Sequence, residues 1–315
     1  PGLRRGRSRA SRGMSSGLRD ALGEDRPVVA ITLMVIAMAL LPIMDAFAKL
    51  LSQDLPVEEV AWWRFLSGLV FILPITLWRY GARTTLRPLQ PGLQILRGCL
   101  TAVSSLLFFA AIATAPLADS MALIFIAPLV VTAASPFVLG EKVGLHRWAA
   151  VCVISALIVI RPGFGNLDPA MLLAAGAGLS HGAFLLVTRR LSRSGPPLAT
   201  LCVTTLVAVL VLTIFQPLVW VPPQPHHWPL IAGMGLFSVL GHFLLIKAFE
   251  VGTATLLAPF GYAEIITATA LGLMIFGDFP DRITWAGIFV IVCSGLYITF
   301  RERVRGRPAS VRPRT

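Results

Sequence analysis

Apolar residues fill about ten long stretches of the chain between Val28 and Phe300, and short polar segments separate them. Each stretch holds about 20 residues, the length of helix that crosses the roughly 30 Å hydrocarbon core of a bilayer. Because lipid cannot hydrogen-bond to backbone N–H and C=O groups, such a stretch crosses the membrane as a helix. The pattern predicts an all-α polytopic membrane protein with ten transmembrane helices, at residues 28–51, 59–79, 92–113, 118–140, 146–161, 169–189, 198–220, 229–249, 254–277 and 283–300.

The composition agrees with a membrane protein and argues against a nucleic-acid partner. Only 13% of the 315 residues are charged, whereas about a quarter are charged in soluble domains. Thirteen of the 27 basic residues lie in the two tails, 1–27 and 301–315. Basic tails beside membrane helices are topology signals or contacts with anionic lipid. No aromatic platform for nucleic acid accompanies them.

The distribution of basic residues predicts how the chain is oriented. The loops after the second, fourth, sixth and eighth stretches carry nine lysines and arginines, whereas the other loops carry only Arg161 and Arg282. Cytoplasmic loops are the ones enriched in such residues. Both tails are therefore expected in the cytoplasm.

A shift of 137 positions brings similar residues of the two halves into register. The matching pairs are Gly140-Glu141 with Gly277-Asp278, Trp148-Ala149 with Trp285-Ala286, Thr132-Ala133 with Thr269-Ala270 and Val153-Ile154 with Val290-Ile291. Five helices per half would insert the halves in opposite orientations, as in many secondary transporters, whose site lies near the midplane. We expect two inverted five-helix repeats, 28–161 and 169–300. Chance similarity between apolar helices is the alternative.

The same residues resemble a known family along nearly all of 28–300. Leu139-Gly140-Glu141 followed by Trp148, and Phe276-Gly277-Asp278 followed by Trp285-Ala286-Gly287, are similar to EamA-type members of the drug/metabolite transporter superfamily. Asp278 stands where that family usually has glutamate. The resemblance implies a ten-helix bundle in the bacterial inner membrane that moves small metabolites by alternating access.

Further segments resemble one branch of this superfamily, which contains S-adenosylmethionine and riboflavin uptake carriers. They are Met44-Asp45-Ala46-Phe47-Ala48-Lys49, Trp62-Trp63-Arg64, Pro116-Leu117-Ala118-Asp119 and Ile126-Ala127-Pro128-Leu129. Exporters of amino acids and opine metallophores are related, so the resemblance leaves the direction of transport open.

Ionisable and aromatic side chains inside the apolar stretches are the candidates for substrate binding or coupling. Ionisable groups are costly in a membrane and therefore indicate function. The candidates are Glu264, His242, His181, Asp45, Arg64, Tyr262, Phe125 and Trp63. Phe125 and Tyr262 occupy equivalent repeat positions and could stack on a ring-bearing substrate, or serve only in packing.

Several of these residues have more than one interpretation. Asp45 lies four residues before Lys49, so the two could pair on one helix face, or Asp45 could meet Arg64 or the substrate. Arg64 could instead reach the interface, where the tryptophans beside it would form an aromatic belt. Glu264 lies near the midplane and is the best candidate for a proton or cation carrier. If Glu264 has only a structural role, its carboxyl needs a hydrogen-bond partner such as His242.

We expect a secondary transporter of a small organic metabolite in the bacterial inner membrane, with S-adenosylmethionine uptake as the first hypothesis. Riboflavin import and amino-acid or metallophore export are alternatives within the same fold. A membrane-embedded lipid-modifying enzyme is the alternative from another class, but no nucleophile–base pair supports it. We expect no cofactor and no metal, since the cysteines are scattered and His226-His227 lacks further ligands nearby in the sequence. Whether protons take part and whether the chain forms a homodimer stay open.

Overall fold

The computed structural model describes residues 27–138, 169–191, 196–251 and 260–278, except positions 89, 125 and 262, together with the isolated residues at 257, 285, 289 and 293. The predicted spans 146–161 and 283–300 fall outside these ranges or touch them only at isolated residues. Apart from Pro27, both basic tails also lie outside the described residues.

Every regular element in the described ranges is helical. The elements are α2 (Pro27–Leu51), α3 (Val57–Leu86), α4 (Pro91–Thr114), α5 (Leu117–Ile124), α6 (Ala127–Val138), α8 (Pro169–Leu191), α9 (Pro197–Thr213), α10 (Gln216–Val219), α11 (His227–Val251), α13 (Ala263–Leu271) and the π-helical turn η2 (Gly272–Phe276). Five of these helices, α2, α3, α4, α8 and α11, are long and apolar enough to cross a membrane. The all-helical prediction is confirmed.

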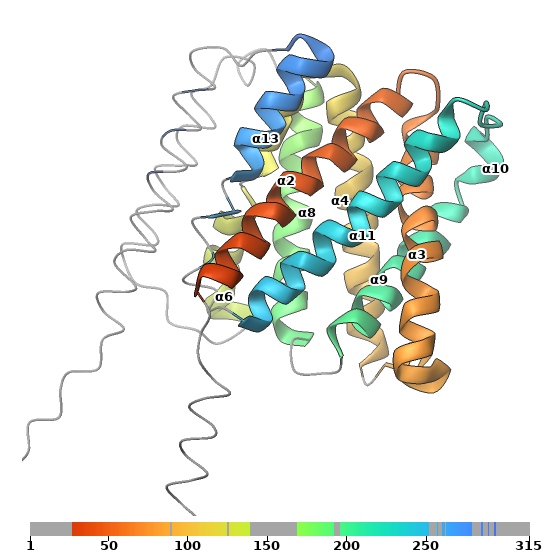
Figure 1. Ribbon diagram of the computed structural model, residues 1–315, viewed down its shortest axis with the longest axis vertical. Helices are drawn as coiled ribbons and strands as arrows, with labels where there is room; N and C mark the ends of the chain where they lie inside the picture. Colours follow the sequence, from red (N-terminus) through yellow and green to blue (C-terminus); the bar gives the residue numbers. More distant parts are fainter. Residues whose placement is uncertain are drawn as a thin grey trace, which may run out of the picture.

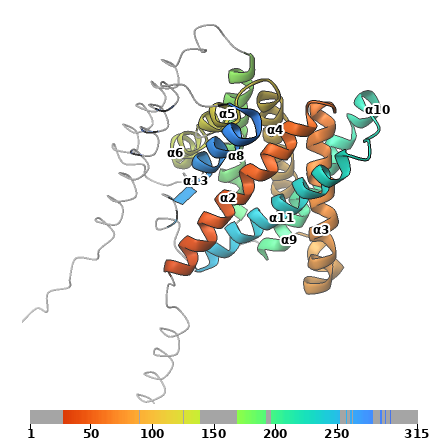
Figure 2. The same ribbon diagram turned by 45° about the horizontal axis from the view of Figure 1, so that its top comes forward.

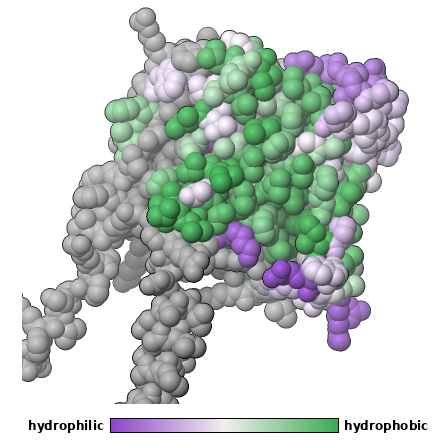
Figure 3. Space-filling view, viewed as in Figure 1, coloured by the Kyte–Doolittle hydropathy of each residue, from purple (hydrophilic) through white to green (hydrophobic). Residues whose placement is uncertain are grey.

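The long helices form a bundle whose members run in alternating directions (Figures 1 and 2). The most extensive helix pairs are α2 with α11, α4 with α8, and α3 with α9. Figure 3 shows a hydrophobic surface across the middle of the visible face and hydrophilic residues gathered at two ends of it. This distribution is the one that a bilayer requires, because the lipid-facing residues must be apolar and the ends contact water and headgroups.

Small residues let the helices approach closely. A Cβ added at Gly178 of α8 would lie 2.8 Å from the carbonyl oxygen of Leu123, and one added at Gly182 would lie 2.6 Å from Cβ of Val130. Ala174, one turn earlier, is fully buried. The three residues recur every four positions and seat α8 against α5 and α6.

Three predicted spans are not continuous α-helices. The stretch 118–140 contains two helices, α5 and α6, because Pro128 lacks the N–H that would continue the hydrogen-bond ladder. In the stretch 198–220, α9 ends at Thr213, and the short helix α10 begins at Gln216 with Pro217 in its first turn. The stretch 254–277 ends in the wider turn η2, and Gly277 closes it with a φ of 70°, a left-handed conformation that favours glycine.

Candidate functional site

Five ionisable side chains from five helices converge inside the bundle. They are Asp45 of α2, Arg64 of α3, His181 of α8, His242 of α11 and Glu264 of α13. Asp45 interacts electrostatically with Arg64 and Glu264. Arg64 interacts in the same way with His181 and His242, which also interact with each other. The structure therefore brings together five of the eight predicted site residues. We call these five residues the central cluster.

Arg64 is held by a neighbouring helix and by aromatic rings. Its Nη1 donates a hydrogen bond of 2.6 Å to Oγ of Ser105 in α4. Its guanidinium carbon lies 5.0 Å from the ring centroid of Phe65 and 5.5 Å from that of Phe109. The buried Nε has no hydrogen-bond partner among the described residues. A guanidinium fixed in this way keeps one donor free for a ligand.

The two carboxyl groups of the central cluster have no partner in the described part of the chain. Asp45 is only 4% exposed, and neither it nor Glu264 forms a hydrogen bond or an ion pair there. Asp45 and Arg64 attract one another without a direct ion pair. Burying an unpaired carboxylate costs several kcal/mol or more. Two such groups side by side therefore form a region that a cation or a hydrogen-bond donor would stabilise.

The two histidines offer different contacts. Nδ1 of His242 lies 2.8 Å from the carbonyl oxygen of Ser238. Because a carbonyl only accepts, Nδ1 carries the proton, and Nε2 of a neutral ring is left as an acceptor. The ring of His181 is stacked on Phe184, with centroids 5.5 Å apart, and it has no hydrogen-bond partner among the residues described. Both rings therefore retain unused hydrogen-bonding capacity.

Lys49 does not pair with Asp45, which corrects one interpretation of the sequence. Its Nζ lies 2.8 Å from Oδ2 of Asp278 and donates a 3.0 Å hydrogen bond to the carbonyl oxygen of Ala115. It also lies 4.6 Å from the ring centroid of Phe276. These partners hold Lys49 at the end of α2 and leave Asp45 without a counter-ion on its own helix.

The remaining candidates are not part of the central cluster. Trp63 donates a 3.1 Å hydrogen bond to Oε1 of Glu59. Its ring contacts those of Trp62, Trp220 and Trp228, with centroids 4.8, 6.1 and 5.4 Å away. It thus belongs to an aromatic group near α10, one residue before Arg64 but on another face of α3. Phe125 and Tyr262 lie outside the described residues.

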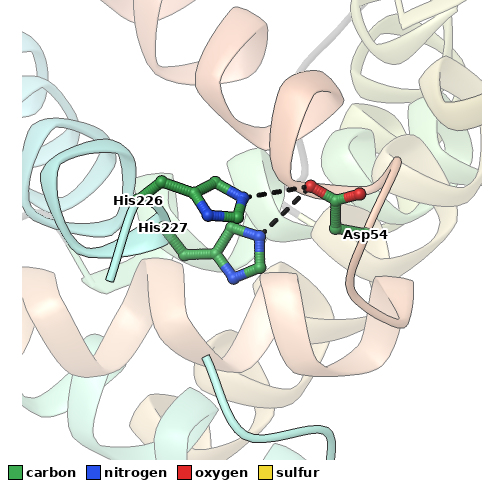
Figure 4. A group of neighbouring side chains, drawn as sticks. All are labelled: Asp54, His226 and His227. Atoms are coloured by element: carbon green, nitrogen blue, oxygen red, sulfur yellow. Dashed lines mark hydrogen bonds and ion pairs between the residues drawn. The ribbon is translucent and has the colours of Figure 1, made fainter. Parts of the chain in front are cut away.

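A second polar cluster lies at the end of the bundle where α2 ends and α11 begins (Figure 4). Oδ2 of Asp54 is 3.2 Å from Nε2 of His227 and 3.5 Å from Nε2 of His226. The three ligand atoms lie within 4.8 Å of one another, close enough to surround one metal ion. The histidine pair was expected to lack further ligands, and the structure supplies Asp54 as a third one. That the protein binds no metal stays a prediction.

The hydrogen bonds of His227 indicate what this second cluster does in the described state. Its Nδ1 accepts a 3.1 Å hydrogen bond from the backbone N–H of Gln224. In a neutral ring the proton therefore lies on Nε2, which donates to Asp54. These hydrogen bonds lower the pKa of the Asp54 carboxyl, His227 more than His226. The cluster joins the loop after α2 to the loop before α11, and Nε2 of His227 has no lone pair for a metal in this state.

The fold and the central cluster together define a class of protein. A polytopic helical membrane protein that buries unpaired ionisable groups between its helices is typical of membrane carriers. The sequence profile of the EamA-like transporter family matches residues 28–161 and 168–300. The chain belongs to this family, whose two-repeat fold is consistent with ten helices.

Several similar proteins are named as transporters. The riboflavin transporter of Vibrio cholerae serotype O1 is 31% identical over 258 residues, which cover 80% of this chain and 86% of the relative. The S-adenosylmethionine uptake transporter of Rickettsia bellii is 26% identical, and the match covers 82% of this chain and 89% of the relative. The pseudopaline exporter of Pseudomonas aeruginosa is 29% identical, and the match covers 84% of this chain and 95% of the relative. Among the solved structures that match, one has a TM-score of 0.63 at 19% identity, and the match covers 88% of this chain and 98% of the solved one. At this identity, the similarity shows the fold alone.

Proposed function

We propose that this transporter takes up S-adenosylmethionine, or a metabolite with the same charge pattern, across the bacterial inner membrane, with both termini in the cytoplasm. The central cluster is its substrate site, and alternating exposure of that site to the two sides of the membrane moves the substrate. The observation that carries the proposal is the pair of carboxyl groups, buried Asp45 and half-buried Glu264, beside one guanidinium, Arg64.

The charges of this site complement those of S-adenosylmethionine. That metabolite has a sulfonium and an ammonium, which match two carboxylates, and one carboxylate, which matches the free Nε of Arg64. Its adenine ring presents donors and acceptors that the two histidine rings can bind. A charged partner strengthens a hydrogen bond about twofold over a neutral pair. A neutral ring system such as riboflavin would leave both carboxylates without counter-ions.

The similarity to a riboflavin transporter nevertheless makes riboflavin import the second candidate. A riboflavin site would rely on ring stacking and on hydrogen bonds between uncharged groups. The two candidates therefore differ in how they depend on charge.

Flux into proteoliposomes tests the proposal. We expect labelled S-adenosylmethionine to enter vesicles that contain the protein, and excess unlabelled riboflavin to leave this flux unchanged. Asp45→Asn should lower the apparent affinity about tenfold or more, because a charge-assisted hydrogen bond contributes about 1.5–3 kcal/mol. Glu58→Gln, at one end of α3, is the matched control and should transport normally. Riboflavin uptake without S-adenosylmethionine uptake would overturn the substrate assignment.

Glu264 is proposed to couple transport to protons. Glu264→Gln keeps the size of the side chain but cannot exchange a proton at physiological pH. We expect this variant still to bind substrate, more weakly because one of the two carboxylates is lost, and to catalyse exchange between equal concentrations, while uptake driven by a pH gradient is abolished. Proton-driven uptake at the normal rate in Glu264→Gln would contradict the coupling role without affecting the substrate assignment.

A further inference from the structure

A cavity of about 490 Å³ lies away from the central cluster, at the end of the bundle where α3 ends and α4 and α9 begin. These helix ends lie together in Figure 1, at the end that the loop charges predict to face the cytoplasm. We call it the headgroup cavity. Its lining includes Arg83, Thr85, Arg87, Gln94 and Thr200.

A break in α3 shapes one wall of this cavity. Gly81 has φ 74° and ψ 161°, so the chain leaves the helix there and turns before residues 82–86. Only glycine adopts that φ without strain. Oγ1 of Thr85 donates a 2.9 Å hydrogen bond to the carbonyl oxygen of Gly81 and fixes the turn. The turn places Arg83 and Arg87 at the rim, where both are exposed.

The cavity is electropositive from its rim to its wall. Behind the wall, Arg97 is only 7% exposed and donates hydrogen bonds to the carbonyl oxygen of Thr200 at 3.4 Å and to Oγ1 of Thr204 at 2.8 Å. Among the residues that the structure describes, no carboxylate forms an ion pair with Arg83, Arg87 or Arg97. A buried cation without a counter-ion is costly, so an anion in the headgroup cavity would be stabilised.

Gln94 adds a requirement that a simple anion does not meet. It is 2% exposed and lines the cavity. Its Nε2 donates a 3.5 Å hydrogen bond to Oγ1 of Thr200, while its buried Oε1 has no partner among the described residues. An unsatisfied buried acceptor costs about 1–3 kcal/mol. The ligand that fits therefore carries a hydrogen-bond donor, such as a hydroxyl, close to its negative charge.

The neighbouring surface favours a lipid as the source of that ligand. Trp78, one turn before Gly81, is 88% exposed, and Ile75 is 51% exposed on the same helix. Tryptophan is enriched at the level of the lipid headgroups, which places the cavity at that depth. Basic pockets between transmembrane helices on the cytoplasmic side bind anionic headgroups. A phosphodiester with a hydroxyl-bearing headgroup is present there at high local concentration.

We propose that the headgroup cavity binds an anionic glycerophospholipid with a hydroxyl on its headgroup, such as phosphatidylglycerol. The phosphate lies between Arg83 and Arg87, and the hydroxyl donates to Oε1 of Gln94. This site is independent of the substrate of the central cluster.

Native mass spectrometry of the purified full chain, after lipid removal and titration with defined lipids, tests the proposal. We expect phosphatidylglycerol to bind at least tenfold more tightly than phosphatidylcholine, and the double variant Arg83→Gln/Arg87→Gln to lose that preference. Arg190→Gln removes an exposed arginine at the same end and is the matched control that should keep it. Equal phosphatidylglycerol binding by the double variant and the wild type would overturn the site.

Two further titrations identify the ligand chemistry. Phosphatidylmethanol has the same charge but no hydroxyl, and it should bind more weakly than phosphatidylglycerol to the wild type and equally to Gln94→Leu. Glycerol 3-phosphate and inorganic phosphate test for a soluble occupant, and we expect neither to compete with phosphatidylglycerol at equal concentration. Competition by either would overturn the lipid assignment. If Gln94→Leu does not fold, the exposed arginine variants still decide the outcome.

Discussion

The buried polar residues of this protein differ in how completely they are satisfied. Arg97 donates to Thr188, Thr200 and Thr204, at 2.8, 3.4 and 2.8 Å, and stacks on the ring of Phe184. Such a group ties α4 to α8 and α9. Asp45, in contrast, is equally buried and has no partner in the described ranges. We propose that the unsatisfied side chains bind the ligand, because a ligand would offset their desolvation cost.

The contact of Asp54 with His226 and His227 is expected to depend on pH. Hydrogen bonds from His227 and His226 lower the pKa of its carboxyl. A lowered carboxyl pKa means that the contact stabilises the folded state at pH values above the usual pKa, and that this stabilisation is lost as the pH falls through the lowered value. We therefore expect the two loops to stay joined throughout the neutral range. Hydrogen exchange at the amide of Gln224, which His227 fixes, measures this.

Three variants separate the contributions to this contact. Asp54→Asn should accelerate exchange at Gln224 at neutral pH, and His227→Ala should do so more strongly because it also removes the acceptor of that amide. His226→Ala should have little effect, since His226 is exposed and its contact with Asp54 is the longer one, 3.5 Å. Slow exchange at Gln224 in Asp54→Asn would show that the carboxylate does not hold the loops together.

Single residues also show what the sequence can and cannot predict. Asp45, Arg64, His181, His242 and Glu264 were predicted as site candidates because charges inside apolar stretches are visible without a structure. The partner of Lys49 was not predicted, because Asp278 lies 229 positions away in the sequence. The contact between Asp54 and His227 spans 173 positions. No local pattern encodes such pairs, which depend on how the helices are arranged.

At the level of helices, the close packing of α8 predicts that one added methyl group lowers the free energy of unfolding. In Gly178→Ala the new Cβ would meet the backbone carbonyl oxygens of Leu123 and Ile124 at 2.8 and 3.3 Å. Backbone atoms cannot rotate away, so α8 must move from α5. We expect the free energy of unfolding to fall by about 1–3 kcal/mol, the usual cost of overpacking. Denaturant titration in detergent micelles, followed by circular dichroism, measures this loss.

The matched control for this variant is Gly92→Ala in α4. A Cβ at Gly92 has nothing within 4 Å, and alanine favours a helix by up to about 1 kcal/mol over glycine. Gly92→Ala should therefore be neutral or slightly stabilising. Equal unfolding free energies for Gly178→Ala and the wild type would mean that α8 does not require the close approach.

The sequence predicts helices better than it predicts where they break. Length and apolarity are sufficient to locate α2, α4, α8 and α11 within about two residues, whereas α3 ends at Leu86, beyond the predicted end at residue 79. The break between α5 and α6 near Pro128, and the π-helical turn after Leu271, require knowledge of backbone conformation. Apolar stretches look alike whether the helix within them is continuous or interrupted. Prolines alone do not decide this, because Pro128 lies at a break whereas Pro42 lies inside the unbroken helix α2.

At the scale of the whole molecule, Lys49 connects the two parts of the chain that match the family profile. Lys49 and Ala115 lie in the first part and Asp278 in the second. The three meet at the end of the bundle where α2, α4 and η2 end. A carrier that exposes its site to each side in turn must separate its halves at one end and then at the other. The ion pair must therefore break whenever this end opens.

Lys49→Met removes the ion pair and keeps an unbranched apolar chain against Phe276. Since Asp278 is 33% exposed, it can be hydrated when the ammonium is absent. We expect the variant to favour the state that is open at this end. Spin labels at Gln53 and Met274, both exposed, should show a longer distance distribution by electron–electron double resonance than in the wild type. Glu58→Gln, which removes a carboxylate at the same end, should leave the distribution unchanged, and an unchanged distribution in Lys49→Met would show that the ion pair does not control opening.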